Sequence, residues 1–162
     1  MRAVSGLVLV GIATLLTFGT AAPARAGAPS GCDDISAIAP FTQFRYTQIQ
    51  SIFDTLTDPK NPFSQLCSSC HPGDVGAAGL GLGDGFSYAN LVGVASAQNP
   101  MILRVSPGNP LSSLLFQKIN CDVPEVGGRM PPGGMISTTQ QAFFYDWIRL
   151  GAPLSRLGFE DR

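Results

Sequence analysis

The residues with the clearest chemistry stand together in the pentapeptide CSSCH, residues 67–71. Two cysteines three positions apart lie on adjacent turns of a short helix, where both thiols can form thioethers with the vinyl groups of one haem. The histidine that follows then faces the haem iron. The pentapeptide therefore predicts one covalent haem c, with Cys67 and Cys70 as attachment residues and His71 as an axial ligand.

A CxxC pair also occurs in zinc sites and in redox-active dithiols. Structural zinc requires four Cys or His ligands, and the sequence has no second ligand pair at finger-like spacing. A thioredoxin-type dithiol is expected at the start of a helix that follows a strand, and no strand-like alternation precedes Cys67. We therefore favour covalent haem over both alternatives.

The second ligand of the iron is constrained by the histidine count. His71 is the only histidine, so two histidines of one chain cannot both bind the iron. A methionine sulfur is then the strongest candidate. Met130 is best placed, because Pro131, Pro132 and the glycines around them fix an extended loop that can present the sulfur opposite His71. Met135, Met101, a lysine-bound site or an open site remain alternatives, and any of these methionines can instead be core filler.

Residues 1–26 have the pattern of a secretory signal peptide. Arg2 supplies the positive start, residues 7–18 an apolar run, and residues 24–26 a small-residue cleavage site. The apolar run is short for a membrane span, although a retained anchor is the alternative. We therefore expect a periplasmic or secreted protein without a stable membrane anchor after cleavage.

The composition limits the possible partners. The formal net charge is −1, and no run of like charges occurs. Nucleic-acid binding is therefore not expected. The length after cleavage suits one domain with a modest core.

Cys32 and Cys121 remain once the haem has taken its pair. In an oxidising compartment two spare cysteines usually join, so the sequence predicts a disulfide between them. Two separate thiols are the alternative, because the sequence alone does not establish that their geometry fits.

Apolar spacing predicts helices at residues 44–56, 61–71, 87–92 and 110–119, and from residue 138 to about residue 150. Residues 27–43 are expected to be an irregular lead-in. Ser87 and Thr138 are expected to cap their helices. In the helix at 110–119, Leu111 is expected to be buried and Lys118 to be exposed. The last helix is expected to pack on the first. The inward face of that last helix is expected to consist of Phe144, Trp147 and Ile148.

Five segments occur in an order and spacing that resemble the planctomycete-type cytochrome c domains, mono-haem relatives of the class I cytochromes c. They are CSSCH, GLGL with Tyr88–Val92, RVSPGNPLSSLLFQKI, GGRMPPGG and DWIRLGAP, within about Ile52–Pro153. The resemblance implies an all-α fold, a small helical domain packed around one covalent haem with long irregular loops, at residues 44–162. It also implies Cys67 and Cys70 as thioether residues, His71 as proximal ligand and Met130 as distal ligand. Cys32 and Cys121 are additions to the family's pattern.

Haem propionates need hydrogen-bond donors or a water-exposed edge. Arg104 and Arg129 flank the expected pocket in sequence and are candidates for charge-assisted bonds to the propionates. Solvated surface arginines are the alternative. Trp147 is expected in the core rather than at a propionate.

A His/Met-ligated haem predicts an electron carrier rather than an enzyme. Occupation of both axial positions suppresses chemistry with oxygen or peroxide, and a carrier needs only transient docking with redox partner proteins. Two alternatives are a small-ligand sensor or enzyme whose sixth position opens, and a haem subunit of a larger redox assembly. Against the sensor or enzyme alternative, the chain has no second histidine that could act as a distal acid or base.

Overall fold

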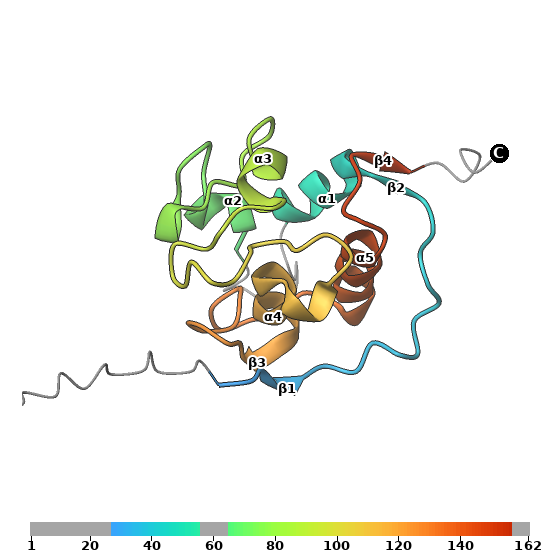
Figure 1. Ribbon diagram of the computed structural model, residues 1–162. Helices are drawn as coiled ribbons and strands as arrows, with labels where there is room; N and C mark the ends of the chain where they lie inside the picture. Colours follow the sequence, from blue (N-terminus) through green and yellow to red (C-terminus); the bar gives the residue numbers. More distant parts are fainter. Residues whose placement is uncertain (1–26, 56–64, 157–162) are drawn as a thin grey trace, which may run out of the picture.

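The computed structural model describes residues 27–55 and 65–156, which form a mixed α/β fold (Figure 1). The predicted signal peptide, the predicted start of the second helix at Asn61, and residues 157–162 lie outside the described residues. Among the described residues, none of the helices has the length and apolar character needed to cross a bilayer. The elements are, in chain order, β1 (Ser30–Cys32), β2 (Phe44–Arg45), α1 (Tyr46–Phe53), α2 (Cys67–Cys70), α3 (Ser87–Leu91), α4 (Leu114–Asn120), β3 (Cys121–Val123), α5 (Thr138–Arg149) and β4 (Ser155–Arg156), with 3-10 turns at Ala77–Gly79 and Pro110–Ser112.

The predicted all-α fold is wrong, because the structure contains two small antiparallel sheets. β1 pairs with β3, and β2 pairs with β4. β1 also lies within residues 27–43, which were expected to be irregular. Strands of two or three residues are too short to display the alternation by which a sequence reveals a strand. Both sheets join segments that are distant in sequence, so their pairing is set by tertiary contacts.

The predicted disulfide between Cys32 and Cys121 is confirmed. The two cysteines are opposite one another in the β1–β3 pair and 89 positions apart in sequence. The backbone N–H of Asp33 extends this pairing by donating to the Asn120 carbonyl at 2.9 Å. The start of the described chain is therefore fixed covalently to the end of α4.

The segment between β1 and β2 runs past α5 (Figure 1). The Phe41 N–H donates to the buried carboxylate of Asp146 at 2.8 Å, and the rings of Phe41 and Phe143 are 5.0 Å apart. At its far end, Phe44 pairs with Arg156 across the β2–β4 sheet. This segment thus bridges the two small sheets along the last helix.

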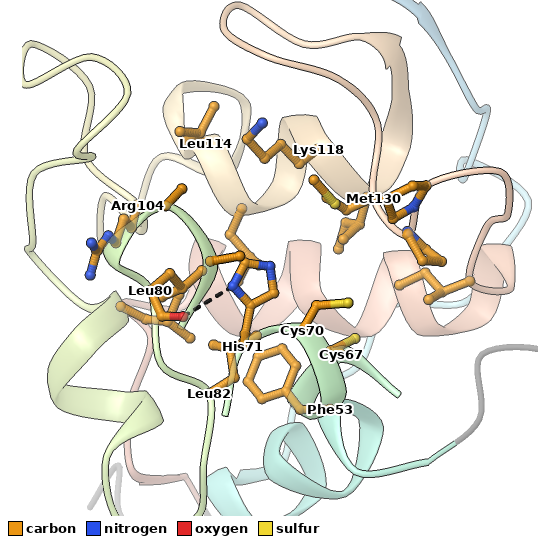
Figure 2. Close-up of a pocket in the computed structure, with 18 of the residues that line it drawn as sticks. Phe53, Cys67, Cys70, His71, Leu80, Leu82, Arg104, Leu114, Lys118 and Met130 are labelled. Atoms are coloured by element: carbon orange, nitrogen blue, oxygen red, sulfur yellow. Dashed lines mark hydrogen bonds between the residues drawn. The ribbon is translucent and has the colours of Figure 1, made fainter. Parts of the chain in front are cut away.

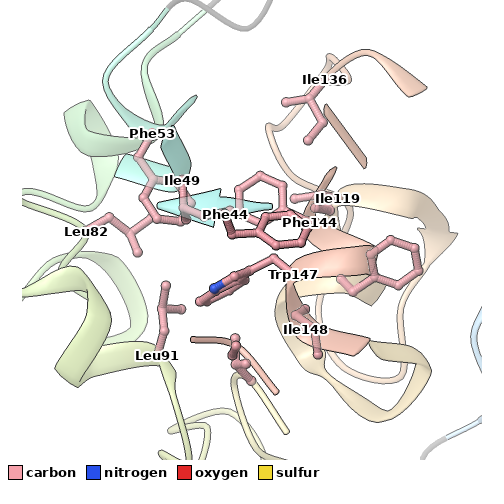
Figure 3. Close-up of a cluster of buried hydrophobic side chains, with 13 residues drawn as sticks. Phe44, Ile49, Phe53, Leu82, Leu91, Ile119, Ile136, Phe144, Trp147 and Ile148 are labelled. Carbon is pink, nitrogen blue, oxygen red and sulfur yellow. The ribbon is translucent and has the colours of Figure 1, made fainter. Parts of the chain in front are cut away.

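The core lies between α5 and the helices facing it (Figure 3). Phe144, Trp147 and Ile148 are all buried, as their helical spacing predicts. The rings of Phe53 and Phe144 lie 5.6 Å apart, and those of Tyr46 and Trp147 lie 5.7 Å apart. These contacts confirm that α5 packs on α1, and burial of such large apolar side chains is the main driving force of folding.

The predicted helix at 110–119 is divided into a 3-10 turn and α4, joined by the extended backbone of Ser113. The break changes which side chains face inward, because a 3-10 turn has a different angular spacing from an α-helix. Leu111 is therefore 68% exposed, and Lys118 is partly buried. The expectations for these two residues are wrong for this reason.

Two predicted helix caps differ from those observed. The hydroxyl of Ser137 accepts from the Gln140 N–H at 3.2 Å, so α5 is capped one residue earlier than Thr138. Ser87 lies within α3, and its buried hydroxyl accepts from Tyr46 and donates to Gln50. The hydroxyl at position 87 thus links α3 to α1 instead of capping a helix.

The disulfide is expected to make a large contribution to stability. Removing it in the Cys32→Ser/Cys121→Ser double variant should lower the free energy of unfolding by about 4 to 5 kcal/mol, since the bond closes a loop of this length. Urea denaturation of the variant and of the wild-type protein measures the difference. An unchanged midpoint and slope would show that the bond does not constrain the unfolded chain.

Candidate functional site

An apolar cavity of about 300 Å³ lies between α1 and α2 on one side and α4 with the loop after β3 on the other (Figure 2). This volume is at the lower end of the range for ligand pockets. Its wall is predominantly aliphatic and aromatic, and polar groups are few. The residues that line it are Ile52, Phe53, Gln65, Leu66, Cys67, Cys70, His71, Ala77, Ala78, Leu80, Leu82, Leu91, Ser96, Gln98, Arg104, Leu114, Leu115, Lys118, Ile119, Met130, Pro131, Pro132, Ile136 and Phe144.

The short helix α2 presents both thiols and the imidazole to this cavity. Its one turn runs from Cys67 to Cys70, and the His71 N–H donates to the Cys67 carbonyl at 3.0 Å. All three side chains line the cavity. Burial raises the pKa of the Cys67 thiol to about 11, so the thiol is protonated at neutral pH. A thioether carries no charge either and therefore suits the same apolar surroundings.

The His71 ring is oriented by a backbone carbonyl. Its Nδ1 lies 3.0 Å from the Leu80 oxygen (Figure 2), and because a carbonyl can only accept, Nδ1 is the donor. The hydrogen bond leaves Nε2 as the nitrogen with a free lone pair, which is the arrangement that an imidazole needs in order to bind a metal. The Leu82 N–H returns a bond to the His71 carbonyl at 2.8 Å.

The glycine-rich loop packs backbone against backbone. A Cβ added at Gly76 would lie 2.5 Å from the His71 Cα and 2.6 Å from the Leu80 oxygen. A Cβ at Gly81 would lie 2.2 Å from the Asp74 carbonyl carbon. Glycine at these positions therefore allows the loop to approach the end of α2 closely enough for Leu80 to reach the His71 ring.

Of the methionines in the described residues, Met130 is the one that lines the cavity. Met101 is 90% exposed and Met135 is 57% exposed. Met130 is held by its backbone, whose N–H donates to the Lys118 carbonyl at 2.7 Å. The Lys118 ammonium donates to the carbonyls of Val126, at 2.9 Å, and Gly128, at 3.3 Å. The structure thus brings Met130 to the same cavity as His71.

Comparison of the chain with protein-family models, with curated proteins and with solved structures finds no match. Support for the site therefore comes from its own residues. Within residues 27–55 and 65–156, no group of three or more His, Cys, Asp or Glu side chains is placed to hold a metal ion. The chemistry that the cavity offers is instead two thiols, one imidazole and one thioether sulfur, a donor set whose chemistry would suit a covalently attached haem.

Arg104 and Arg129, the two candidates for bonds to haem propionates, lie in different surroundings. Arg104 lines the cavity, and its guanidinium donates to the carbonyls of Asn90 and Gly79, each at 2.8 Å. Arg129 is not among the lining residues and forms ion pairs with Asp33 and Asp122. The structure therefore brings Arg104 to the site but not Arg129. Trp147 is in the core and donates to the Pro153 carbonyl at 3.0 Å.

Several lining residues carry no sequence signal that indicates a site. Gln65 and Gln98 belong to no motif. Lys118 lies within the segment RVSPGNPLSSLLFQKI, but the expected helix phase placed it on the solvent side. An apolar cavity that receives the side chains of Arg104 and Lys118 is the structural feature that identifies them. Neither cation forms an ion pair with another described residue.

Gly76→Ala should disturb the placement of His71, because the new Cβ meets backbone that cannot move independently of α2. We expect a loss of about 1 to 3 kcal/mol or more in the free energy of unfolding, measured by thermal or urea denaturation. Gly128→Ala is the matched control, since its Cβ would enter open space, and its effect should stay within about 0.5 kcal/mol. Equal stability of the two variants would contradict the close approach.

Proposed function

We propose that this protein is an exported mono-haem c-type cytochrome of the planctomycete-type kind that acts as an electron carrier. The observation that carries the proposal is that one apolar cavity receives the side chains of Cys67, Cys70, His71 and Met130. Cys67 and Cys70 would hold the haem as thioethers, and the His71 imidazole and the Met130 sulfur would bind its iron. The sequence places the first three together on one turn of helix, but Met130 reaches them only through the fold.

The bound haem would supply reversible one-electron exchange. Each of the surrounding residues has a separate task. Leu80 fixes the tautomer and orientation of the His71 ring, and the aliphatic wall excludes water. Met130 would supply a thioether sulfur to the iron, and a thioether ligand favours the reduced state relative to harder ligands. If His71 and Met130 both bind the iron, the site would be suited to electron transfer and not to substrate binding.

The positive charges of Arg104 and Lys118 in the cavity wall also support the proposal, because they would attract an anionic group of the cofactor. Arg104 and Lys118 donate to neutral carbonyls, so their charges are not cancelled by a described carboxylate. Burial lowers the pKa of both side chains, which reflects the cost of placing a cation there. Two haem propionates would offset that cost, and Arg104 is the residue that we assign to this role.

The disulfide supports export. Bonds of this kind persist in oxidising compartments and are rare where thiols are kept reduced. With the signal-like residues 1–26, it favours a periplasmic or secreted protein. The partners would be redox proteins that dock transiently, since redox encounters commonly use small interfaces.

The covalent attachment can be tested directly. The exported wild-type protein should carry the mass of one haem in intact-protein mass spectrometry, and should be reduced and reoxidised reversibly in its visible spectrum. A Cys67→Ala/Cys70→Ala double variant should lose the covalent mass, because no thioether can form. Absence of the haem mass from the wild-type protein would overturn the proposed function.

The axial assignment predicts different effects for two methionines. Met130→Ala should keep the covalent haem but abolish methionine coordination, observed as loss of the shifted methionine methyl signal in the NMR spectrum of the reduced protein. Met135→Ala is the matched control, because Met135 is outside the cavity and exposed, and it should leave that signal in place. Persistence of the signal in Met130→Ala would move the assignment to another residue.

A further inference from the structure

Arg129, the residue before the proposed distal ligand Met130, is bound by Asp33, which lies near the start of the described chain. Arg129, which precedes Met130, forms an ion pair with Asp33 and a second one with Asp122 at 2.8 Å. Arg129 is largely buried, with 13% of its side chain exposed. A displacement of the Met130 backbone away from the cavity would therefore disturb the largely buried Arg129 guanidinium and its partners.

Asp33 is itself attached to the fold at several points. Its backbone N–H donates to the Asn120 carbonyl at 2.9 Å, and its own carbonyl accepts from the Asn120 amide at 3.0 Å. Its carboxylate accepts from the buried amide of Gln141 at 2.7 Å as well as from Arg129. The preceding residue is Cys32, which the disulfide ties to Cys121. Asp33 is thus a fixed acceptor.

The two carboxylates that bind Arg129 differ in their surroundings. The Asp33 side chain is 26% exposed and has the additional bond from Gln141, whereas the Asp122 side chain is 69% exposed. Exposed ion pairs are screened by water and contribute little, while hydrogen bonds to partly buried charged groups contribute more. The position of the Arg129 side chain should therefore be stabilised mainly by Asp33 and less by Asp122.

The opposite side of the same loop is held by α4. The Met130 N–H donates to the Lys118 carbonyl, and the Lys118 ammonium donates to the carbonyls of Val126 and Gly128. Lys118 and Asp33 therefore fix the loop from two directions, one through its carbonyls and one through the Arg129 side chain.

We propose that Asp33 is a positioning residue for Met130, acting through Arg129. The disulfide-anchored segment that carries Asp33 would keep the distal methionine at the cavity, and weakening it would let the sulfur leave and open the sixth position. The inference rests on the proposed function for its haem readout. It assigns a role in the site to residues 27–45, the segment before the first helix. None of these residues lines the cavity.

The test compares Asp33→Asn with Asp122→Asn, since each removes one carboxylate charge from Arg129. Carbon monoxide binding to the reduced, haem-loaded protein reports how often Met130 leaves the iron. Asp33→Asn should accelerate binding about tenfold, and Asp122→Asn should stay within about threefold of the wild-type rate. Equal rates for the two variants would overturn the proposal, as would an Asp33→Asn variant that loses thermal stability at an unchanged binding rate.

Arg129→Gln provides a second variant that leaves Asp33 and its bonds to Asn120 and Gln141 in place. It should show the same acceleration as Asp33→Asn, because both break the connection between Asp33 and the loop. It also keeps the proposal testable if Asp33→Asn fails to fold. A wild-type rate in Arg129→Gln would overturn the proposal.

Hydrogen exchange of the Met130 amide gives a readout that does not depend on haem. This amide is protected by its bond to Lys118, and its exchange should accelerate about tenfold in Asp33→Asn but not in Asp122→Asn. If the wild-type protein carries no haem, the proposed function fails and the exchange measurement alone decides on the role of Asp33. If haem is present and the amide exchanges alike in all variants, the role of Asp33 is overturned while the cytochrome proposal stands.

Discussion

The hydrogen bond between the His71 ring and the Leu80 carbonyl is the contact on which the site depends. It fixes which nitrogen of the only histidine faces the cavity. Leu80 can reach the ring because Gly76 leaves no side chain between the loop and α2, and Arg104 holds the adjacent Gly79 carbonyl. A single side-chain orientation is therefore maintained by a loop that has little regular structure of its own.

Side-chain donors stabilise the irregular stretches in a similar way. Loop carbonyls near the cavity need partners, because a polar backbone group without one is costly to bury. The Asn90 amide donates to the carbonyls of Asp74 and Gly81, and Lys118 donates to those of Val126 and Gly128. The helices are short, so these bonds, the two small sheets and the disulfide supply order that longer helices would otherwise provide.

The features that could be predicted from the sequence are those encoded locally or by counting. The spacing of CSSCH places three side chains on one turn, two spare cysteines suggest one bond, and the apolar period of α5 identifies its buried face. The missed features depend on tertiary contacts. β1 and β2 are too short to alternate, Ser113 interrupts the helix phase that would have buried Leu111, and Ser87 finds partners on α1 that no local pattern indicates. Arg129 has one of its two ion-pair partners, Asp33, in the segment before the first helix, so the position of Arg129 in the chain gave no indication of its role.

The Cys32–Cys121 bond closes a covalent ring of chain that contains Cys67, Cys70 and His71, whereas Met130 lies outside that ring. The cost of bringing two points of a chain together grows with the number of residues between them. Only a short stretch of chain separates Met130 from Cys121, which the disulfide fixes to the fold. If Met130 left the cavity, the conformational entropy cost of bringing it back would therefore be small. His71 thus belongs to a macrocycle and Met130 to a short arm outside it, so under the proposed ligation the methionine could detach and rebind while the macrocycle stays intact.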